Sequence, residues 1–169
     1  MIFSFQRLVT RTIVASILLG SGAQVAYASP GEHGFAFGEP GKSGAVDRTI
    51  RVAAADTEFS IEKMHIHAGE TIRFIVTNTG ELDHDFTIGP ADLQAKHRQE
   101  MMEMMGGGDA MAEMHEEPNA VYLEPGETKE LVWRFAKTNG LEFACNVPGH
   151  YESGMKGSIA PNVGHESSS

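Results

Sequence analysis

One short segment near the C-terminus gathers three side chains that bind soft metals. It carries the only cysteine of the chain, Cys145, followed by His150 and Met155 at the spacing C-x4-H-x4-M. A thiolate, an imidazole and a thioether are donors that select copper, in a plane of one cysteine and two histidines with a weak axial methionine. The set needs a second histidine. His84 is the best candidate, because it lies between two strand-like segments where a second loop could reach the same end of a sheet sandwich.

Zinc is the main chemical competitor of copper for these donors, since it also accepts cysteine and histidine. Methionine is a poor zinc ligand, so Met155 in the fourth position argues for copper. Burial of Cys145 as a small core residue is the plain alternative to ligation. The histidine and the methionine at fitting distances along the chain make that alternative the weaker one.

An antiparallel β sandwich is the fold that the sequence predicts around these donors. Apolar and polar residues alternate, as in strands with one buried face, through residues 49–54, 71–77, 131–135 and 141–145. By this alternation, Cys145 lies on the core side at the very end of its strand. Gly-Glu-Thr turns at 69–71 and 126–128 each begin a long strand, as in two similarly built halves. No helix alternates with the strands, and we therefore expect an all-β Greek-key sandwich.

Both ends of the chain are predicted to lie outside the folded domain. Residues 1–28 contain two arginines, an apolar stretch and the triplet Ala26-Tyr27-Ala28, which is typical of a cleaved secretory signal peptide. Residues 29–44 are rich in glycine and proline and predict a flexible arm. Residues 162–169 predict a disordered tail. The folded domain is then expected to span residues 45–161.

The composition narrows the range of partners. The formal net charge is −10 for the chain and becomes −12 once the two arginines of the signal segment are removed. Such a charge argues against nucleic acid and anionic lipid surfaces as partners. One cysteine cannot form an internal disulfide, and a lone thiol is a liability in an exported protein. Metal ligation would account for the presence of this cysteine. We expect an exported monomer that does not insert into a membrane after cleavage.

A methionine-rich insertion interrupts the strand pattern at about residues 90–118. Composition predicts a helix over 91–105, a stop at the glycines 106–108 and a second short helix over 109–116. Helical spacing groups seven residues on two faces, namely His97, Met101, Met104, Met105, Met111, Met114 and His115. One interpretation is a flexible apolar face packed over the sandwich. The other is a second site that collects Cu(I), to which Met64, His65 and His67 could also contribute.

The pattern of His84 and C-x4-H-x4-M over residues 45–160 resembles the cupredoxins, the small type 1 blue-copper proteins. The resemblance implies one copper held by His84, Cys145, His150 and Met155, with His150 as the port for electrons. The single cysteine excludes the binuclear copper site of oxidase subunits, which needs two. Asp85 stands where many relatives carry an asparagine that braces the ligand loop. Pro148 lacks an amide hydrogen, so at most the amides of Asn146, Val147 and Gly149 are expected to donate near the sulfur of Cys145.

The enrichment in methionine and histidine is similar to bacterial periplasmic copper-tolerance cupredoxins, whereas plastocyanin, azurin and auracyanin share only the core. Two functions follow from these resemblances. One is copper handling in the periplasm with one-electron redox chemistry at the site. The other is electron transfer with a cytochrome or an oxidase as partner. Neither is enzymatic; a third interpretation, oxidation of bound Cu(I), has less support.

Overall fold

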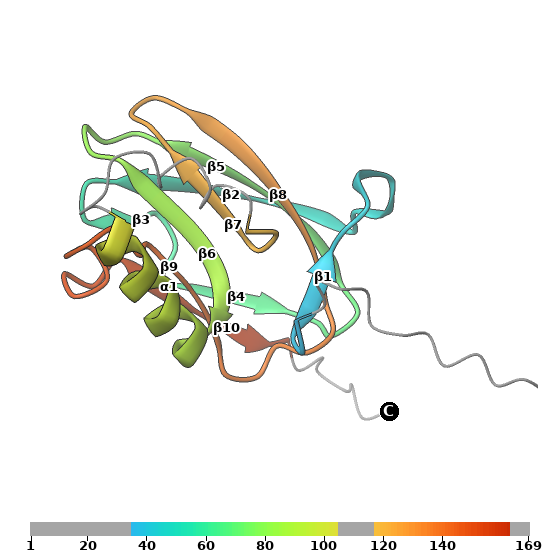
Figure 1. Ribbon diagram of the computed structural model, residues 1–169. Coiled ribbons are helices and arrows are strands. Elements are labelled where there is room, and N and C mark those ends of the chain that lie inside the picture. The colour runs from blue at the N-terminus through green and yellow to red at the C-terminus, as the bar shows by residue number, and fades with distance from the viewer. Residues whose placement is uncertain (1–34, 105–116, 163–169) are drawn as a thin grey trace, which may run out of the picture.

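The computed structural model describes residues 35–104 and 117–162 of the chain. These residues form ten strands, one α-helix and one short 3-10 helix (Figure 1). The elements are β1 (Gly38–Pro40), η1 (Ser43–Ala45), β2 (Arg48–Ala55), β3 (Glu58–Phe59), β4 (Lys63–Ile66), β5 (Thr71–Asn78), β6 (His84–Pro90), α1 (Ala91–Met104), β7 (Ala120–Leu123), β8 (Thr128–Phe135), β9 (Leu141–Ala144) and β10 (Lys156–Pro161).

Two five-stranded sheets make up the sandwich, with the strand orders β1-β8-β5-β2-β3 and β4-β10-β9-β6-β7. The expected all-β sandwich is confirmed, and the helix expected after β6 is present as α1, Ala91–Met104, up to the last residue described there. The expectation of purely antiparallel strands is wrong, because β2 pairs with β5, and β4 with β10, in parallel. Alternation reports which face of a strand is buried, and it carries no information on the direction of the neighbouring strand.

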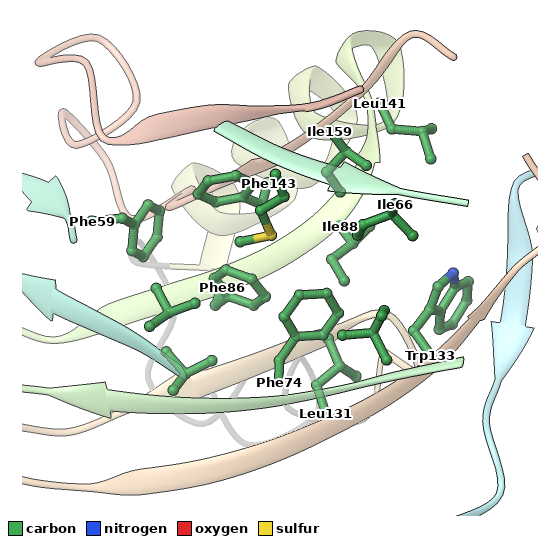
Figure 2. Close-up of a cluster of buried hydrophobic side chains, with 14 of the residues drawn as sticks. Phe59, Ile66, Phe74, Phe86, Ile88, Leu131, Trp133, Leu141, Phe143 and Ile159 are labelled. Carbon is green, nitrogen blue, oxygen red and sulfur yellow. The ribbon is translucent and has the colours of Figure 1, made fainter. Parts of the chain in front are cut away.

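The core lies between the two sheets and is rich in phenylalanine (Figure 2). Phe86 of β6 contacts the rings of Phe59, Phe74 and Phe143, with centroids 5.5 to 5.6 Å apart. Each such ring contributes roughly 1.5 to 3 kcal/mol when it is fully buried. Cys145 belongs to the same buried cluster. The strands β6 and β9, which lead to the candidate ligands, are therefore anchored by buried aromatic rings.

Helix α1 follows β6 directly and packs beside β6 and β9 (Figure 1). It begins immediately after Pro90, and Asp92 in its first turn complements the positive end of the helix dipole. No helix within the described residues is long and apolar enough to cross a membrane. The predicted signal segment, residues 29–34 of the predicted arm and residues 163–169 of the predicted tail lie outside the described residues, as does the expected second short helix. Residues 35–44 of the predicted arm are described. They include β1, which pairs with β8, and Phe37, which is buried in the core, so this part of the arm packs against the sandwich.

Candidate metal centre

Two neighbouring strands carry the first histidine and the cysteine to one end of the sandwich. His84 is the first residue of β6, and Cys145 directly follows the last residue of β9. The two strands are antiparallel neighbours in which Thr87 pairs with Ala144. The start of one strand therefore lies beside the end of the other. The turn after β9 then brings His150 back to the same place.

The three donor atoms already have the spacing that a metal needs. The Sγ of Cys145 lies 3.4 Å from Nδ1 of His150 and 3.8 Å from Nδ1 of His84. All three donors lie within 4.8 Å of one another, and within the described residues they are the only such group of three or more His, Cys, Asp and Glu side chains. Donors about 2.0 to 2.3 Å from a shared metal in a trigonal plane lie roughly 3.7 Å apart. The residues present therefore fit a metal that prefers nitrogen and sulfur.

Met155 closes the loop that carries the other donors. Its carbonyl accepts a hydrogen bond of 3.0 Å from the amide of Cys145, and its own amide donates one of 3.0 Å to the carbonyl of His150. Its side chain is fully buried in the cluster that contains Cys145. Gly149 enables the tight turn before His150, since its φ of 88° is strained for other residues. The placement is compatible with the predicted axial role of Met155.

Two backbone amides point at the sulfur. The Asp85 amide donates to Cys145 Sγ at 3.3 Å, and the Val147 amide also donates to it. The sequence-based expectation named only amides of the ligand loop and was incomplete. Asp85 follows the first histidine, and the pairing of β6 with β9 brings its amide to the sulfur. The sequence gives no signal for this contact without that pairing.

Burial sets the protonation of all three donors. Burial first, and the charge of Asp85 second, together raise the pKa of the Cys145 thiol to about 12. Burial lowers the pKa of His84, with a smaller contribution from the neighbouring His150. Burial likewise lowers the pKa of His150. At neutral pH the metal-free site therefore holds a neutral thiol and two neutral imidazoles, and a metal must displace one proton.

Asp85 connects the two ligand segments through a buried hydrogen-bond network. Its carboxylate accepts bonds from the amide of Asn146 at 3.3 Å, from the side-chain nitrogen of Asn146 at 2.9 Å and from the hydroxyl of Thr87 at 2.8 Å. Asn146 directly follows Cys145. Asp85, which follows His84, is thus hydrogen-bonded to Asn146, which follows Cys145. In this chain a carboxylate therefore connects the two ligand segments, where many cupredoxins use an asparagine.

Helix α1 completes this network. Gln94 is fully buried, donating to the Thr87 carbonyl at 2.9 Å and accepting from the Asn146 side chain at 2.7 Å. His97 Nε2 lies 3.5 Å from the Asp85 carboxylate. Burial acts to lower the pKa of His97, but the hydrogen bond and the charge of Asp85 outweigh it, so that the pKa is raised. These α1 residues were not predicted as neighbours of the copper ligands, because helix-to-sheet contacts leave no local sequence signal.

The other residues of the proposed Cu(I) site divide into two groups. His97 lines a cavity of about 90 Å³, and Met101, one turn further along α1, is buried. The Met104 side chain, Met105, Met111, Met114 and His115 lie outside the described part. Met64 packs in the core, whereas His65 of the edge strand β4 and His67, just after its end, are exposed. The structure does not bring any of these three into the group of metal donors.

The sandwich and the His-Cys-His group at its end define a cupredoxin. Residues 46–162 match the family described as copper binding proteins of the plastocyanin/azurin family. The chain belongs to this family. It is 40% identical over 170 residues to the copper-resistant cuproprotein CopI of Pseudomonas aeruginosa, covering 87% of this chain and 92% of the relative. CopI of Vibrio cholerae is 40% identical over 124 residues, covering 72% of this chain and 70% of the relative.

Solved structures support the same fold. Auracyanin from Roseiflexus castenholzii matches with a TM-score of 0.57 and 24% identity, covering 69% of this chain and 98% of the other. Auracyanin B matches with a TM-score of 0.59 and 21% identity, covering 73% and 94%. The expected relation to cupredoxins, and to copper-resistance proteins among them, is confirmed.

Proposed function

We propose that this protein is an exported, periplasmic type 1 copper protein whose one-electron redox chemistry serves copper tolerance. The observation that carries the proposal is the convergence of Cys145 Sγ with Nδ1 of His84 and of His150, at 3.8 and 3.4 Å. Met155 would supply a fourth ligand to the copper in this proposal. Bound copper would supply a centre that cycles between Cu(I) and Cu(II). The residues hold the donors in place, so that little rearrangement accompanies the cycle.

The role in copper tolerance is supported by two observations. The matched relatives carry the name copper-resistant cuproprotein, and one of them is covered over 92% of its length. In addition, α1 leads into a segment rich in methionine and histidine. A thioether binds Cu(I) without the tendency of a thiol to form disulfides in an oxidising compartment. This combination favours a protein that binds copper ions as well as holding one as a cofactor.

A second Cu(I) site would begin at His97 and continue into the residues after α1. Nδ1 of His97 lies 4.0 Å from the Glu100 carboxylate, and His97 lines the 90 Å³ cavity beside α1. Met101 is buried one turn away, so it supports packing of the helix at least as well as metal binding. The segment after Met104 therefore decides between an apolar cover and a copper-collecting site.

Dedicated electron transfer is the alternative function, and the surface near the histidines favours it. His150 is only half buried, in contrast to His84 and Cys145, and would act as the electron port. Leu82, two residues before His84, is 49% exposed, which is unusual for a large apolar side chain in this protein. A cytochrome or an oxidase would be the partner. In both functions we expect a non-enzymatic monomer.

Copper titration of the mature protein, started at residue 29, tests the proposal. We expect one Cu(II) with an intense thiolate-to-Cu(II) absorption band and its EPR signal, and the loss of both in Cys145→Ser. Absence of the band from the wild-type protein would overturn the site. In competition with a Cu(I) chelator, copper handling predicts additional Cu(I) equivalents that disappear in the joint variant Met104→Leu/Met105→Leu. Met64→Leu is the matched control, since Met64 is buried in the core.

The same variants separate tolerance from electron transfer in cells. Growth of a host that lacks its own copy is measured in rising copper concentrations, with expression levels matched. The copper-tolerance role predicts that wild type restores growth and that Cys145→Ser does not. Full restoration by Cys145→Ser would contradict a tolerance role of the type 1 centre, and a wild type without effect on growth would favour electron transfer.

A further inference from the structure

One arginine of α1 contacts the ligand loop at two separate points. Arg98 Nη1 donates to the side-chain oxygen of Asn146 at 3.4 Å. The carbon of its guanidinium group also lies 3.6 Å from the ring centroid of Tyr151. Asn146 directly follows Cys145, and Tyr151 directly follows His150. A single side chain outside the loop therefore reaches the neighbours of two candidate ligands.

The environment of Arg98 makes these contacts stronger than ordinary surface contacts. Only 18% of its side chain is exposed, and its Nε lies 3.5 Å from the Glu152 carboxylate. Cation–π contacts are worth roughly 0.5 to 1 kcal/mol when exposed and about 2 kcal/mol when desolvated. The carboxylate offsets the charge of the guanidinium while the Tyr151 ring covers it. Arg98 is thus held in place on the loop side of α1.

Tyr151 is fixed from several directions. Lys156 Nζ also lies over this ring, 3.9 Å from its centroid. The Tyr151 hydroxyl donates to the Glu142 carboxylate at 2.9 Å. The ring therefore connects α1 with β9 and β10. Because Tyr151 is the residue after His150, its position restrains the backbone that carries this histidine.

The Asn146 side chain is fixed at both of its ends. Its nitrogen donates to Gln94 and to Asp85, at 2.7 and 2.9 Å, and its oxygen accepts from Arg98. Two of these three partners come from α1. The helix therefore determines the orientation of the residue that follows the cysteine, independently of the ring contact at Tyr151.

We propose that Arg98 is a positioning residue of the copper centre, which holds Asn146 and Tyr151 and thereby fixes the donor atoms of Cys145 and His150. This inference rests on the proposed copper site. His150 is the more sensitive of the two donors, because it is half buried whereas Cys145 is fully buried in the core. Helix α1 then helps to position the copper ligands, in addition to leading into the methionine-rich segment.

The test compares Arg98→Ala and Arg98→Lys with the wild-type mature protein. Arg134→Ala is the matched control, since Arg134 is exposed and pairs with Glu39 at 3.4 Å, and both lie in the sheet that does not carry the ligands. We expect Arg98→Ala to bind one copper still, with a changed ratio of its thiolate-to-Cu(II) absorption bands and changed EPR parameters. Arg98→Lys keeps the positive charge near the ring, so it should restore part of the change. Arg134→Ala should match the wild type.

Amide hydrogen exchange of the metal-free proteins provides a readout that is independent of copper. We expect exchange at His150 and Tyr151 to rise about fivefold or more in Arg98→Ala, from the loss of contacts of the cation–π size. Unchanged exchange together with an unchanged spectrum overturns the role of Arg98 and leaves the copper site intact. A wild type without the absorption band overturns the proposed site, and the exchange comparison still decides whether Arg98 holds the loop. Should Arg98→Ala fail to fold, as judged by circular dichroism, Arg98→Lys against wild type decides by the same two readouts.

Discussion

The affinity for Cu(I) should depend steeply on pH far above neutrality, because of the buried thiol of Cys145. Metal binding requires the thiolate, and burial together with the charge of Asp85 raises the pKa of the thiol from 9.0 to about 12. The pKa values of His84 and His150 are lowered below 6.5, so both imidazoles are neutral above pH 8. Only one proton is then displaced by the metal between pH 8 and pH 10.

The size of the effect follows from the pKa of Cys145. With a pKa of about 12, the thiolate fraction, and with it the apparent affinity, rises about 100-fold between pH 8 and pH 10. A thiol with the ordinary value of 9.0 would give a rise of about tenfold, since half of it is already ionised at pH 9. The two cases differ by about one order of magnitude, which competition with a chromogenic Cu(I) chelator resolves easily.

Anaerobic titrations at pH 8, 9 and 10, corrected for protonation of the chelator, measure this dependence. A rise of only tenfold would refute the reasoning that burial and Asp85 hold the thiol neutral. Asp85→Asn provides the internal check, because it removes the negative charge while an amide oxygen can still accept a hydrogen bond from Asn146. In titrations extended to pH 12, the affinity of this variant should level off at a lower pH than that of the wild type, because its thiol has a lower pKa. Levelling at the same pH would mean that burial alone sets the pKa of Cys145.

Two further predictions concern stability and are measured by urea unfolding of the metal-free protein. Gln94→Leu should cost roughly 1 to 3 kcal/mol, because it leaves a buried β6 carbonyl without its donor; Gln99→Leu, on the exposed side of α1, should stay within about 0.5 kcal/mol of wild type. Gly157→Ala should cost roughly 1 to 3 kcal/mol, because a Cβ there would collide with the ring of Phe143. Gly44→Ala, where nothing lies within 4 Å of the added carbon, should be close to neutral. Equal losses in test and control variants would contradict these assignments.

Much of the fold and part of the candidate site could be predicted because they depend on local patterns. Period-two alternation located the strands β2, β5, β8 and β9, and it placed Cys145 on the core side at a strand end. Donor chemistry then linked Cys145 with His150 and selected His84 as the third donor. The structure brings these three together. The axial role of Met155 stays a prediction, although its backbone closes the loop.

The support around the donors could not be predicted, because it arises from contacts between distant segments. Gln94 and Arg98 are an ordinary polar and an ordinary charged residue of a helix in the sequence. Only the packing of α1 beside β6 and β9 brings them to Asn146, 52 and 48 residues further along the chain. The parallel pairing of β2 with β5 and of β4 with β10 also could not be predicted, because it joins strands that are not adjacent in the sequence. Local patterns identify the donors, and tertiary packing determines how rigidly they are held.

The buried carboxylate of Asp85 has a consequence for the redox chemistry of the proposed centre. A buried charge is costly unless hydrogen bonds compensate it, and here Thr87, Asn146 and His97 surround the carboxylate. Its charge is felt at the sulfur, since it raises the pKa of Cys145. A fixed negative charge beside the thiolate favours the more positive state of a bound copper, Cu(II) over Cu(I). The carboxylate should therefore lower the reduction potential relative to Asp85→Asn, through the same charge that adds to burial in raising the pKa of Cys145.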